Sequence, residues 1–380
     1  MLIKTTHGHA KIVRSAKEVD QALWQCAMAP QCQDCRYYEV IEETLKEPFD
    51  YRYAILTNTH DDRATVQPFF FVDQDITAGL PKRLRALAER VRRAFPRFLN
   101  YKIAMVGCAA AEGQLACAEP WALQMLHEAI DVCARVEGAK VVLFKDFPSI
   151  YRDDFRHLTR LGYTRVPSMP AAKLHLDFKS FEDYMTRRLS RIYRKNLRRK
   201  FRDSDRFGAL RMEVVRDVTP HIEEVFSLYQ QTFRRSEFRF EELTKNYFCE
   251  LGRRMPERVR FFLWRDGEQI VAFAVCMIHG DVLHDLNVGM DYSVALDRHL
   301  YFVTLRDIVS WALNENLKIY QTGPLNYDPK LHLRLDLAPQ DLYARHLSPM
   351  LNPIFGWALH FLEPTRHDPI LRKFANSHEL

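Results

Sequence analysis

The clearest pattern of hydrophobic and polar positions lies in the second half of the chain. Three apolar runs there, at 261–265, 270–278 and 283–290, have the lengths of β-strands. Asp266-Gly267 separates the first two runs, and this dipeptide is a strong signal for a two-residue hairpin turn. Residues 300–312 then place apolar side chains at helical spacing. The pattern predicts an antiparallel meander of three strands that leads into an amphipathic helix.

The first half carries a fainter copy of the same order of elements. Pro120 suits the first position of a helix and Gly138 suits its end, so one helix is predicted between them. The strands predicted in this half are 53–58, 65–72, 102–108, 140–144 and 173–178. The other predicted helices are a basic one at 80–94 and a short one at 153–161. The repeated order predicts two domains of similar architecture.

A long basic helix is predicted at 180–202, opened by the N-cap pattern Ser-x-x-Asp at Ser180. Its arginines recur every three or four residues and so share one face. They include Arg191, Arg194 and Arg198. This face is interpreted as a binding surface for a phosphate-bearing substrate, since arginine makes bidentate contacts with phosphate. The alternative is a solvated helix face balanced by nearby aspartates.

Length and composition bound the fold and the compartment. A chain of 380 residues with 47% hydrophobic residues is long enough for two domains, which we place at 1–179 and 180–380. No apolar run reaches the roughly 18 residues that a membrane span needs, so a cytoplasmic protein without stable membrane insertion is expected. The apolar stretch 351–362 is too short to span and is predicted to be a packed tail helix.

The eight cysteines are scattered and are expected to be reduced thiols. Cys26, Cys32 and Cys35 are spaced like three ligands of a zinc site, with a nearby histidine as a fourth. A lone C-x-x-C is a weak signal, so ordinary cysteines and no metal are expected. The net charge of +6 is too small for this length to indicate nucleic-acid binding by itself.

Five stretches in the second half carry a family resemblance. They are SRIYRKNLRRKFRD (190–203), RFFLWRDGEQIVAF (260–273), ALDRHLYFVTLRDIVSWA (295–312), NYDPKLHLR (326–334) and LYARH (342–346). With them the chain resembles tandem-GNAT proteins, relatives of the Fem-type aminoacyl ligases that extend peptidoglycan cross-bridges. The resemblance implies an α+β fold with two GNAT-like domains, each a mixed, mostly antiparallel sheet flanked by helices. It also implies an acyltransferase.

The resemblance places the acyl donor, acyl-CoA or an acyl carrier protein, at the start of the helix at 300–312. GNAT enzymes that use acetyl-CoA usually hold its pyrophosphate with a glycine-rich turn there. The equivalent loop, 293–299, has no glycine. Asp297 would put a negative charge near the phosphates, and Arg298 or His299 could offset it.

Amine acylation needs a group that accepts a proton from the amine and a donor of hydrogen bonds to the leaving group. His284 and Asp291 lie on the predicted strand 283–290 or directly after it and are candidate catalytic residues. Tyr327 is a candidate general acid, or a structural staple of its loop. In Fem-type relatives a similar Tyr-Lys pair contacts substrate phosphate, which makes Lys330 a candidate binding residue.

The last candidates are Arg345 and His346, which could bind an acceptor carboxylate or satisfy backbone carbonyls. The leading hypothesis is an N-acyltransferase acting on an amine of a small metabolite or cell-envelope precursor. One alternative is a Fem-type ligase that uses aminoacyl-tRNA through the basic helix. The other is a catalytically inactive scaffold that binds nucleic acid or anionic lipid. The motifs of the α/β-hydrolases, zincins and P-loop nucleotide triphosphatases are absent from the sequence.

Overall fold

The computed structural model describes residues 1–28, 31–75, 90, 92–93, 100–236 and 239–380. The predicted basic helix at 80–94 lies almost entirely outside the described residues. The chain forms two compact units. The first unit comprises Met1–Met169, Pro339–Leu371 and Glu379–Leu380, and the second comprises Pro170–Ala338 and Arg372–His378.

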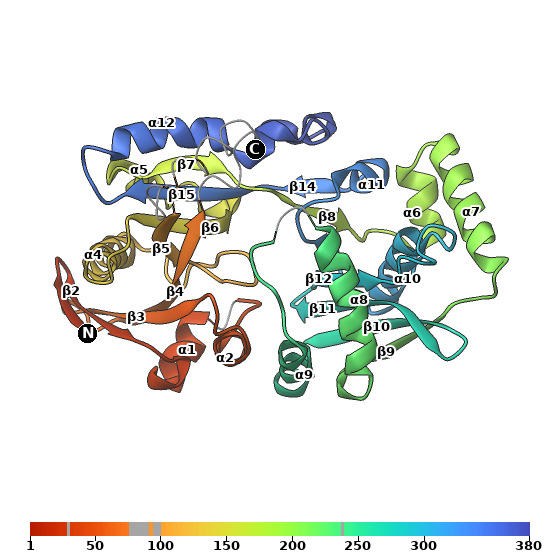
Figure 1. The fold of residues 1–380 in the computed structure, drawn as a ribbon, viewed down its shortest axis with the longest axis horizontal. Helices are drawn as coiled ribbons and strands as arrows, with labels where there is room; N and C mark the ends of the chain where they lie inside the picture. The colour runs from red at the N-terminus through yellow and green to blue at the C-terminus, as the bar shows by residue number, and fades with distance from the viewer. Residues whose placement is uncertain (29–30, 76–89, 91, 94–99, 237–238) are drawn as a thin grey trace. The chain divides into compact units, whose positions relative to one another are not determined.

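The first unit is built on an eight-stranded sheet with the order β1-β2-β3-β4-β5-β6-β15-β7 (Figure 1). All its neighbouring strands are antiparallel except β5 and β6. The strands are β1 (Leu2–Thr5), β2 (Gly8–Val13), β3 (Asp50–Asn58), β4 (Ala64–Asp75), β5 (Asn100–Val106), β6 (Val141–Pro148), β7 (Thr164–Pro167) and β15 (Gln340–His346). The strands predicted at 53–58, 65–72, 102–108 and 140–144 correspond to β3, β4, β5 and β6.

Helix α4 (Pro120–Val136) packs its apolar face on this sheet, and it begins and ends where Pro120 and Gly138 predicted. The other helices among the described residues of the unit are α1 (Gln21–Met28), α2 (Cys35–Thr44), α5 (Arg156–Arg160) and α12 (Asn352–Leu362). Helix α12, predicted as a tail helix, runs along β15 and β7 (Figure 1).

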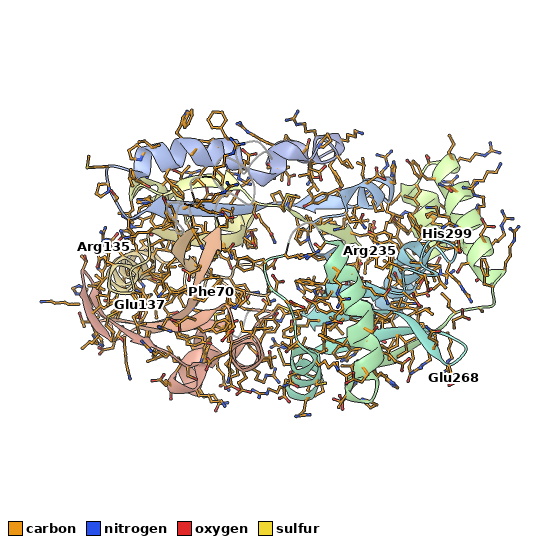
Figure 2. All side chains as sticks on the ribbon, viewed as in Figure 1. Phe70, Arg135, Glu137, Arg235, Glu268 and His299 are labelled. Atoms are coloured by element: carbon orange, nitrogen blue, oxygen red, sulfur yellow. The ribbon has the colours of Figure 1, made fainter. Side chains whose placement is uncertain are left out.

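The second unit is built on a seven-stranded sheet with the order β14-β8-β13-β12-β11-β10-β9. The strands are β8 (Ala171–His175), β9 (Arg211–Val215), β10 (Val259–Asp266), β11 (Gln269–His279), β12 (Val282–Met290), β13 (Ile319–Thr322) and β14 (Asp336–Ala338). The predicted meander is β10-β11-β12, and Glu268 marks the turn after β10 (Figure 2). The helix predicted at 300–312 is α10 (Leu300–Asn314).

Helices cover both faces of this second sheet. Alternate residues of β10 and β11 face α8 (Ile222–Arg235) and α9 (Lys245–Arg254), where Phe248 meets Phe273 at a ring distance of 5.8 Å. The opposite residues pack with α6 (Phe181–Arg188), α7 (Arg191–Asp205) and α10 in one core cluster. A short helix, α11 (Tyr327–His332), follows β13. Short 3-10 helices occur at Ala16–Glu18, Ser149–Tyr151, Thr219–His221, Pro364–His367, Leu371–Lys373 and Ser377–Glu379.

The single helix predicted at 180–202 is instead two helices, α6 (Phe181–Arg188) and α7 (Arg191–Asp205). Ser180 caps α6 as predicted, accepting a hydrogen bond from the Asp183 amide. The break falls at Leu189, whose extended backbone (φ −100°, ψ 145°) buries its side chain in the core. Ser190 then caps α7. Core burial at Leu189 therefore outweighs the continuous helical pattern of the sequence.

The units do not divide the chain at one point, whereas the sequence analysis set a single boundary between residues 179 and 180. Strand β8 precedes that point but lies between β13 and β14 of the second sheet. Strand β15 follows the second unit but lies between β6 and β7 of the first sheet. Each sheet thus contains one interior strand that lies outside the domain range predicted for it from the sequence.

Candidate active site in the second unit

The candidate site lies where strands β12 and β13 of the second sheet part, and we call this parting the fork. The parallel pairing of β12 with β13 runs from Val282↔Ile319 to Asp285↔Thr322 and stops there. Strand β12 continues to Met290, paired only with β11 among the described strands. A β-bulge leaves Leu286 without a partner, because Cys276 pairs with Asp285 and Val275 pairs with Asn287. Bulges re-aim side chains and often lie next to active sites.

The exposure of β12 shows that the fork is open. Residues 284–288 of this interior strand are all partly exposed, whereas residues 270–277 of neighbouring β11 are fully buried. An interior strand with helices on both faces is ordinarily buried throughout. The partly exposed stretch therefore lines a gap where β13 has left the sheet.

Asp285 is the last residue of β12 paired with β13, and it lies at the closed end of the fork. Its carboxylate accepts a hydrogen bond of 2.7 Å from the hydroxyl of Tyr320 on β13. Burial raises the pKa of Asp285 from 3.8 to about 6, although the Tyr320 hydrogen bond and the charge of Lys330 act in the opposite direction. A carboxyl group with a pKa near neutrality is suited to proton transfer at physiological pH.

Two tyrosines adjoin this carboxyl group. Burial, followed by the charge of Asp285, raises the pKa of both Tyr320 and Tyr301 above its ordinary value. Tyr320 is fully buried, whereas Tyr301, in the first turn of α10, is partly exposed. Both phenols are therefore protonated at neutral pH, and Tyr301 is the one that a ligand can reach.

Lys330 on α11 is buried, and its charge acts on Asp285 at the closed end of the fork. Its ammonium group donates to the carbonyl oxygens of Gly323 and Leu325, at 2.5 and 2.7 Å. Burial lowers the pKa of Lys330 to about 8, against the charge of Asp285. The lysine therefore fixes the loop that leaves β13 and supplies positive potential near Asp285.

The three candidate catalytic residues from the sequence do not meet at one point. Tyr327 is buried and donates to the carbonyl of Pro170 at 2.8 Å, as a structural staple of its loop would. Asp291, beyond the far end of β12, accepts from the amide and hydroxyl of Ser293 at 2.9 and 2.7 Å. His284 adjoins Asp285, but burial and then the charge of His279 lower the pKa of His284 to about 4, which makes it a weak base.

The loop before α10 is held by Arg298, which is buried. Its guanidinium group donates to the carbonyls of Phe207 and Gly208, at 2.8 and 2.7 Å, and pairs with Asp266. Arg298 thus anchors this loop to backbone carbonyls, whereas the sequence analysis expected it near the donor phosphates. Asp297 is exposed.

His299 lies at the amino end of α10 (Figure 2), where no side chain of the described residues caps the helix. Burial and then the charge of Lys200 lower the pKa of His299. The charge of Arg199 also lowers this pKa, whereas the carboxylates of Asp203 and Asp297 raise it, so two cations and two carboxylates lie close to this helix end. The amides of Leu300, Phe302 and Val303 already donate to backbone carbonyls, so the attraction for an anion here comes from the helix dipole and the two cations.

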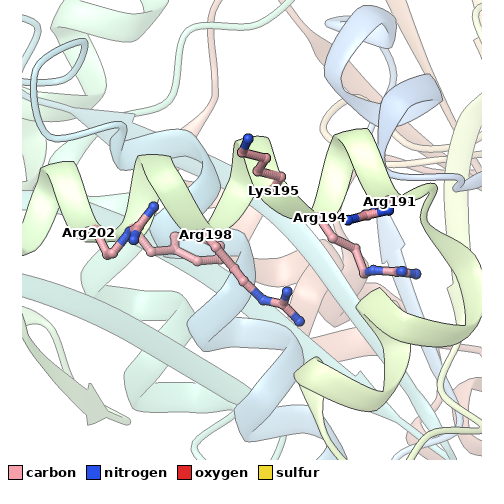
Figure 3. Close-up of a pocket in the computed structure, with 6 residues that line it drawn as sticks. Arg191, Arg194, Lys195, Arg198 and Arg202 are labelled. Atoms are coloured by element: carbon pink, nitrogen blue, oxygen red, sulfur yellow. The ribbon is translucent and has the colours of Figure 1, made fainter.

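The basic face of α7 lines a cavity of about 620 Å³ (Figure 3). Its lining residues are Arg191, Arg194, Lys195, Arg198, Phe201 and Arg202. Arg194 donates to the carbonyls of Thr186 and Leu189, and Arg198 pairs with Glu182. The side chains of Arg191, Lys195 and Arg202 have no hydrogen bond or ion pair with any described residue. We call this cavity the α7 groove.

Arg345 and His346 lie on β15 in the first unit, so they are not part of the fork. Arg345 pairs with Asp131 and lies against the ring of Tyr163. The backbone amide of His346 donates to Asn352 at 2.9 Å, and its imidazole accepts from the Ser348 amide at 3.0 Å. Both side chains have partners within their own unit.

The first unit has the same parallel pair, β5 and β6, but its own chain occupies the place where they part. The amide of Gly113 donates to the carbonyl of Asp146 at 2.9 Å. A Cβ atom at Gly113 would lie 2.4 Å from the Lys145 carbonyl oxygen and 2.6 Å from the Phe147 ring. Glycine is required for this close approach, and it brings the loop onto the end of β6. The fork of the second unit is therefore the better candidate site.

No cluster of three or more histidine, cysteine or carboxylate side chains within the described ranges is placed to bind a metal ion. Cys26 is exposed and Cys32 is buried, so these two candidate ligands differ in environment. Across the described part of the chain, no helix is both long and apolar enough to cross a membrane.

Comparison with known proteins agrees with this architecture. Residues 191–330 match the acetyltransferase (GNAT) domain family. A search of curated protein sequences finds no significant match. The solved structure of FemX is similar with a TM-score of 0.54 at 12% identity, over 88% of this chain and 96% of that one.

Two further solved structures share the fold. One is the C-terminal domain of a putative lysylphosphatidylglycerol synthetase from Agrobacterium fabrum, with a TM-score of 0.51 at 13% identity, over 92% of this chain and 97% of that one. The other is a tandem GNAT protein from the clavulanic acid biosynthesis pathway, with a TM-score of 0.50 at 10% identity, over 90% and 99%. At such identities the likeness concerns the fold.

The fold and the family match show what this chain is similar to. Residues 191–330 match the GNAT domain, and the chain shares its fold with FemX and with a tandem GNAT protein, as the resemblance of its sequence predicted. The predicted α+β architecture of two GNAT-like parts is confirmed. The second unit carries the match to the GNAT superfamily of transferases.

Proposed function

We propose that the chain is an N-acyltransferase that moves an acyl group to an amine of a small metabolite or cell-envelope precursor. The donor in this proposal is acyl-CoA or an acyl carrier protein, and the reaction takes place in the cytoplasm. One observation carries it: β12 and β13 part after Asp285 and Thr322 and leave a partly exposed gap. An extended thioester arm fits between two strands that no longer pair, because their free backbone groups can hydrogen-bond to it.

In the proposed reaction the acceptor amine attacks the thioester carbonyl at the closed end of the fork. A carbon–nitrogen bond forms, the carbon–sulfur bond breaks, and the amine loses one proton. Asp285 accepts that proton, because its pKa of about 6 leaves it mostly ionised at pH 7 yet basic enough to act. The hydroxyl of Tyr301 donates a hydrogen bond to the departing thiolate.

The amino end of α10 is the proposed site of the donor's phosphates. The positive end of the α10 dipole, with Lys200 and Arg199 of α7 nearby, supports this placement without a glycine-rich turn. His299 joins this anion site in the proposal. Asp297 is exposed beside it and would weaken phosphate binding, so Asp297→Asn is a useful variant for donor affinity.

The direct test is to incubate the purified chain with CoA thioesters of several chain lengths and a mixture of primary amines, with product detection by mass spectrometry. Binding is measured beforehand as the increase in the thermal midpoint with CoA. Acylated product and a shift with CoA are expected. If no thioester is consumed and neither CoA nor a pantetheine thioester shifts the midpoint, the proposal fails.

The α7 groove favours a second candidate, a ligase that uses aminoacyl-tRNA as its donor. Three of its cations have no partner among the described residues, as expected of side chains that meet phosphates. This candidate predicts transfer from charged tRNA and none from thioesters. Binding of tRNA should weaken steeply with salt and should exceed the binding of heparin, a sulfated polyanion without RNA structure.

A further inference from the structure

Helix α12 and the turn directly before it expose large apolar side chains. Ile354, Trp357 and Phe361 on the helix are 64%, 65% and 53% exposed, and Met350 and Leu351 in the turn are 86% and 48% exposed. The helix residues are spaced three and four apart and so lie on one side of α12. We call this surface the α12 ridge.

The ridge is held rigidly by the opposite side of the same helix. A Cβ atom at Gly356 would lie 2.5 Å from the hydroxyl oxygen of Thr164 on β7, so the helix backbone rests directly on the sheet. Asn352 donates to the carbonyl of Gly162 at 2.8 Å and accepts from the amide of His346 at 2.9 Å. The helix therefore has a defined inner face, and the apolar outer face is a fixed feature of the first unit.

Charge around the ridge indicates the kind of surface that it meets. The sequence from Ser348 to Phe361 contains no acidic residue, and His360 is exposed beside the ridge. The guanidinium group of Arg366 lies 5.9 Å from the ring of Phe361, and its side chain is about half exposed although Glu363 is 3.5 Å away. Aromatic and aliphatic side chains with an arginine at their edge are typical of helices that lie in the headgroup region of an anionic bilayer.

A second protein copy fits the ridge less well. The ridge offers five large apolar side chains, whereas a stable interface takes roughly 20–30 residues from each partner. A stable protein interface needs about 800 Å² on each partner. A narrow convex row can instead enter the boundary between lipid headgroups and acyl chains without a complementary partner.

We propose that the α12 ridge docks the first unit on the surface of anionic phospholipid membranes, with Trp357 and Phe361 inserted at the level of the headgroups. This proposal does not depend on the transferase reaction. It concerns a reversible surface contact, since 11 residues are too few to span a bilayer.

The experiment is flotation of the full chain with vesicles of phosphatidylcholine alone and with about one third phosphatidylglycerol. All five tryptophans lie in the described part of the chain, and among them Trp357 is the exposed one. A blue shift of the tryptophan fluorescence therefore reports the insertion of Trp357. Flotation and a blue shift with the anionic vesicles are expected. The double variant Trp357→Ser/Phe361→Ser should lose about tenfold or more of its partitioning, because two large apolar groups no longer leave water.

The matched control is Ile150→Ser, which removes a 78% exposed apolar side chain elsewhere in the same unit. It should float like the unaltered chain, and circular dichroism should show that all variants are folded. Equal flotation of the double variant overturns the proposal, as does flotation lost only in Arg191→Ala/Arg202→Ala, which would assign the lipid contact to the α7 groove. A concentration-dependent dimer in size-exclusion chromatography that the double variant abolishes would also overturn it, in favour of a second copy.

Discussion

The carboxyl group of Asp285 is subject to opposing influences. Burial favours its neutral form, whereas the hydroxyl of Tyr320 and the charge of Lys330 favour the ionised form, and the resulting pKa is about 6. His284 lies one residue earlier. Burial and the charge of His279 both lower the pKa of His284, to about 4. At pH 7 the carboxylate is therefore the stronger base of the two.

Replacing Asp285 by asparagine should lower kcat/KM for amine acylation by about 100-fold or more, because general base catalysis usually contributes that much. The matched control is Asp281→Asn, in the exposed turn before β12, which should leave the rate unchanged. The unaltered enzyme should lose activity below about pH 6 as Asp285 is protonated, and the variant should lack this step. A variant with full activity and the same pH profile would exclude Asp285 as the base.

The same pKa shift has a consequence for stability. Because the pKa of Asp285 is raised in the folded chain, folding is most favoured below about pH 4, where the carboxyl group is neutral, and this contribution is lost as the pH rises through about 6. Asp285→Asn should therefore gain stability relative to the unaltered chain between those pH values, on the order of 2 kcal/mol. Urea unfolding of both chains at pH 4.5 and 7.5 measures the difference. A difference that does not change with pH would contradict the raised pKa.

At the scale of elements, Lys330 connects α11 to the loop that leaves β13. Leu325 and Asn326 in this loop have positive φ values of 70° and 50°, which is unfavourable for residues with a side chain. The two hydrogen bonds from the Lys330 ammonium group to Gly323 and Leu325 hold this conformation. The loop therefore depends on a buried charge for its shape.

Lys330→Met should cost about 2 kcal/mol of stability, since charged hydrogen bonds to two carbonyls are lost while the burial cost of the ammonium group is also removed. Chemical unfolding measures this loss, and the exposed Lys318→Met serves as control. If Lys330→Met is as stable as the control, the staple role is wrong.

The α7 groove makes a different prediction, because three of its cations stabilise nothing in the described structure. Replacing Arg191, Lys195 and Arg202 together by alanine should leave the thermal midpoint unchanged or slightly raised, since like charges at helical spacing repel. The affinity for a phosphate-bearing ligand should fall about tenfold or more, with a shallower dependence on salt. Fluorescence anisotropy with labelled tRNA, and with a nucleoside diphosphate as competitor, measures this. Replacing Arg187, which pairs with Asp177, is the matched control.

Periodicity predicted the strands and helices around the site well. It could not show that Asp285, Tyr320 and Tyr301 lie close together, because pairing sets the register of β12 and β13 and packing on the sheet places α10. Periodicity also predicted a single helix where the structure has α6 and α7. An apolar residue such as Leu189 fits a helical pattern whether or not its backbone is helical. Arg298 was assigned to a ligand because the sequence does not reveal the carbonyls of Phe207 and Gly208 that it reaches.

For the whole molecule, the least predictable feature is the placement of β8 and β15. Alternating hydrophobicity identifies a strand but not the sheet that it joins. Strand β15 brings Asp341 into the first unit, where the buried carboxylate pairs with Arg152 and Arg165. Strand β8 brings Leu174 into the core of the second unit and provides the Pro170 carbonyl for Tyr327. A boundary at residue 179 would separate β8 from the sheet that it completes.

This placement can be tested with two fragments of the chain. The fragment 170–338 contains all seven strands of the second sheet, whereas 180–338 lacks β8, which lies between β13 and β14. Without β8, strand β14 loses its pairing partner and β13 keeps only β12, and the apolar residues around Leu174 are exposed to water. The longer fragment should be soluble with a cooperative thermal transition, and the shorter one should aggregate or unfold without one. Adding a peptide of residues 170–179 to the shorter fragment should restore the transition, as strand addition at an open position of the sheet requires. Equal stability of the two fragments would mean that β8 is dispensable and that a boundary after residue 179 is physically adequate.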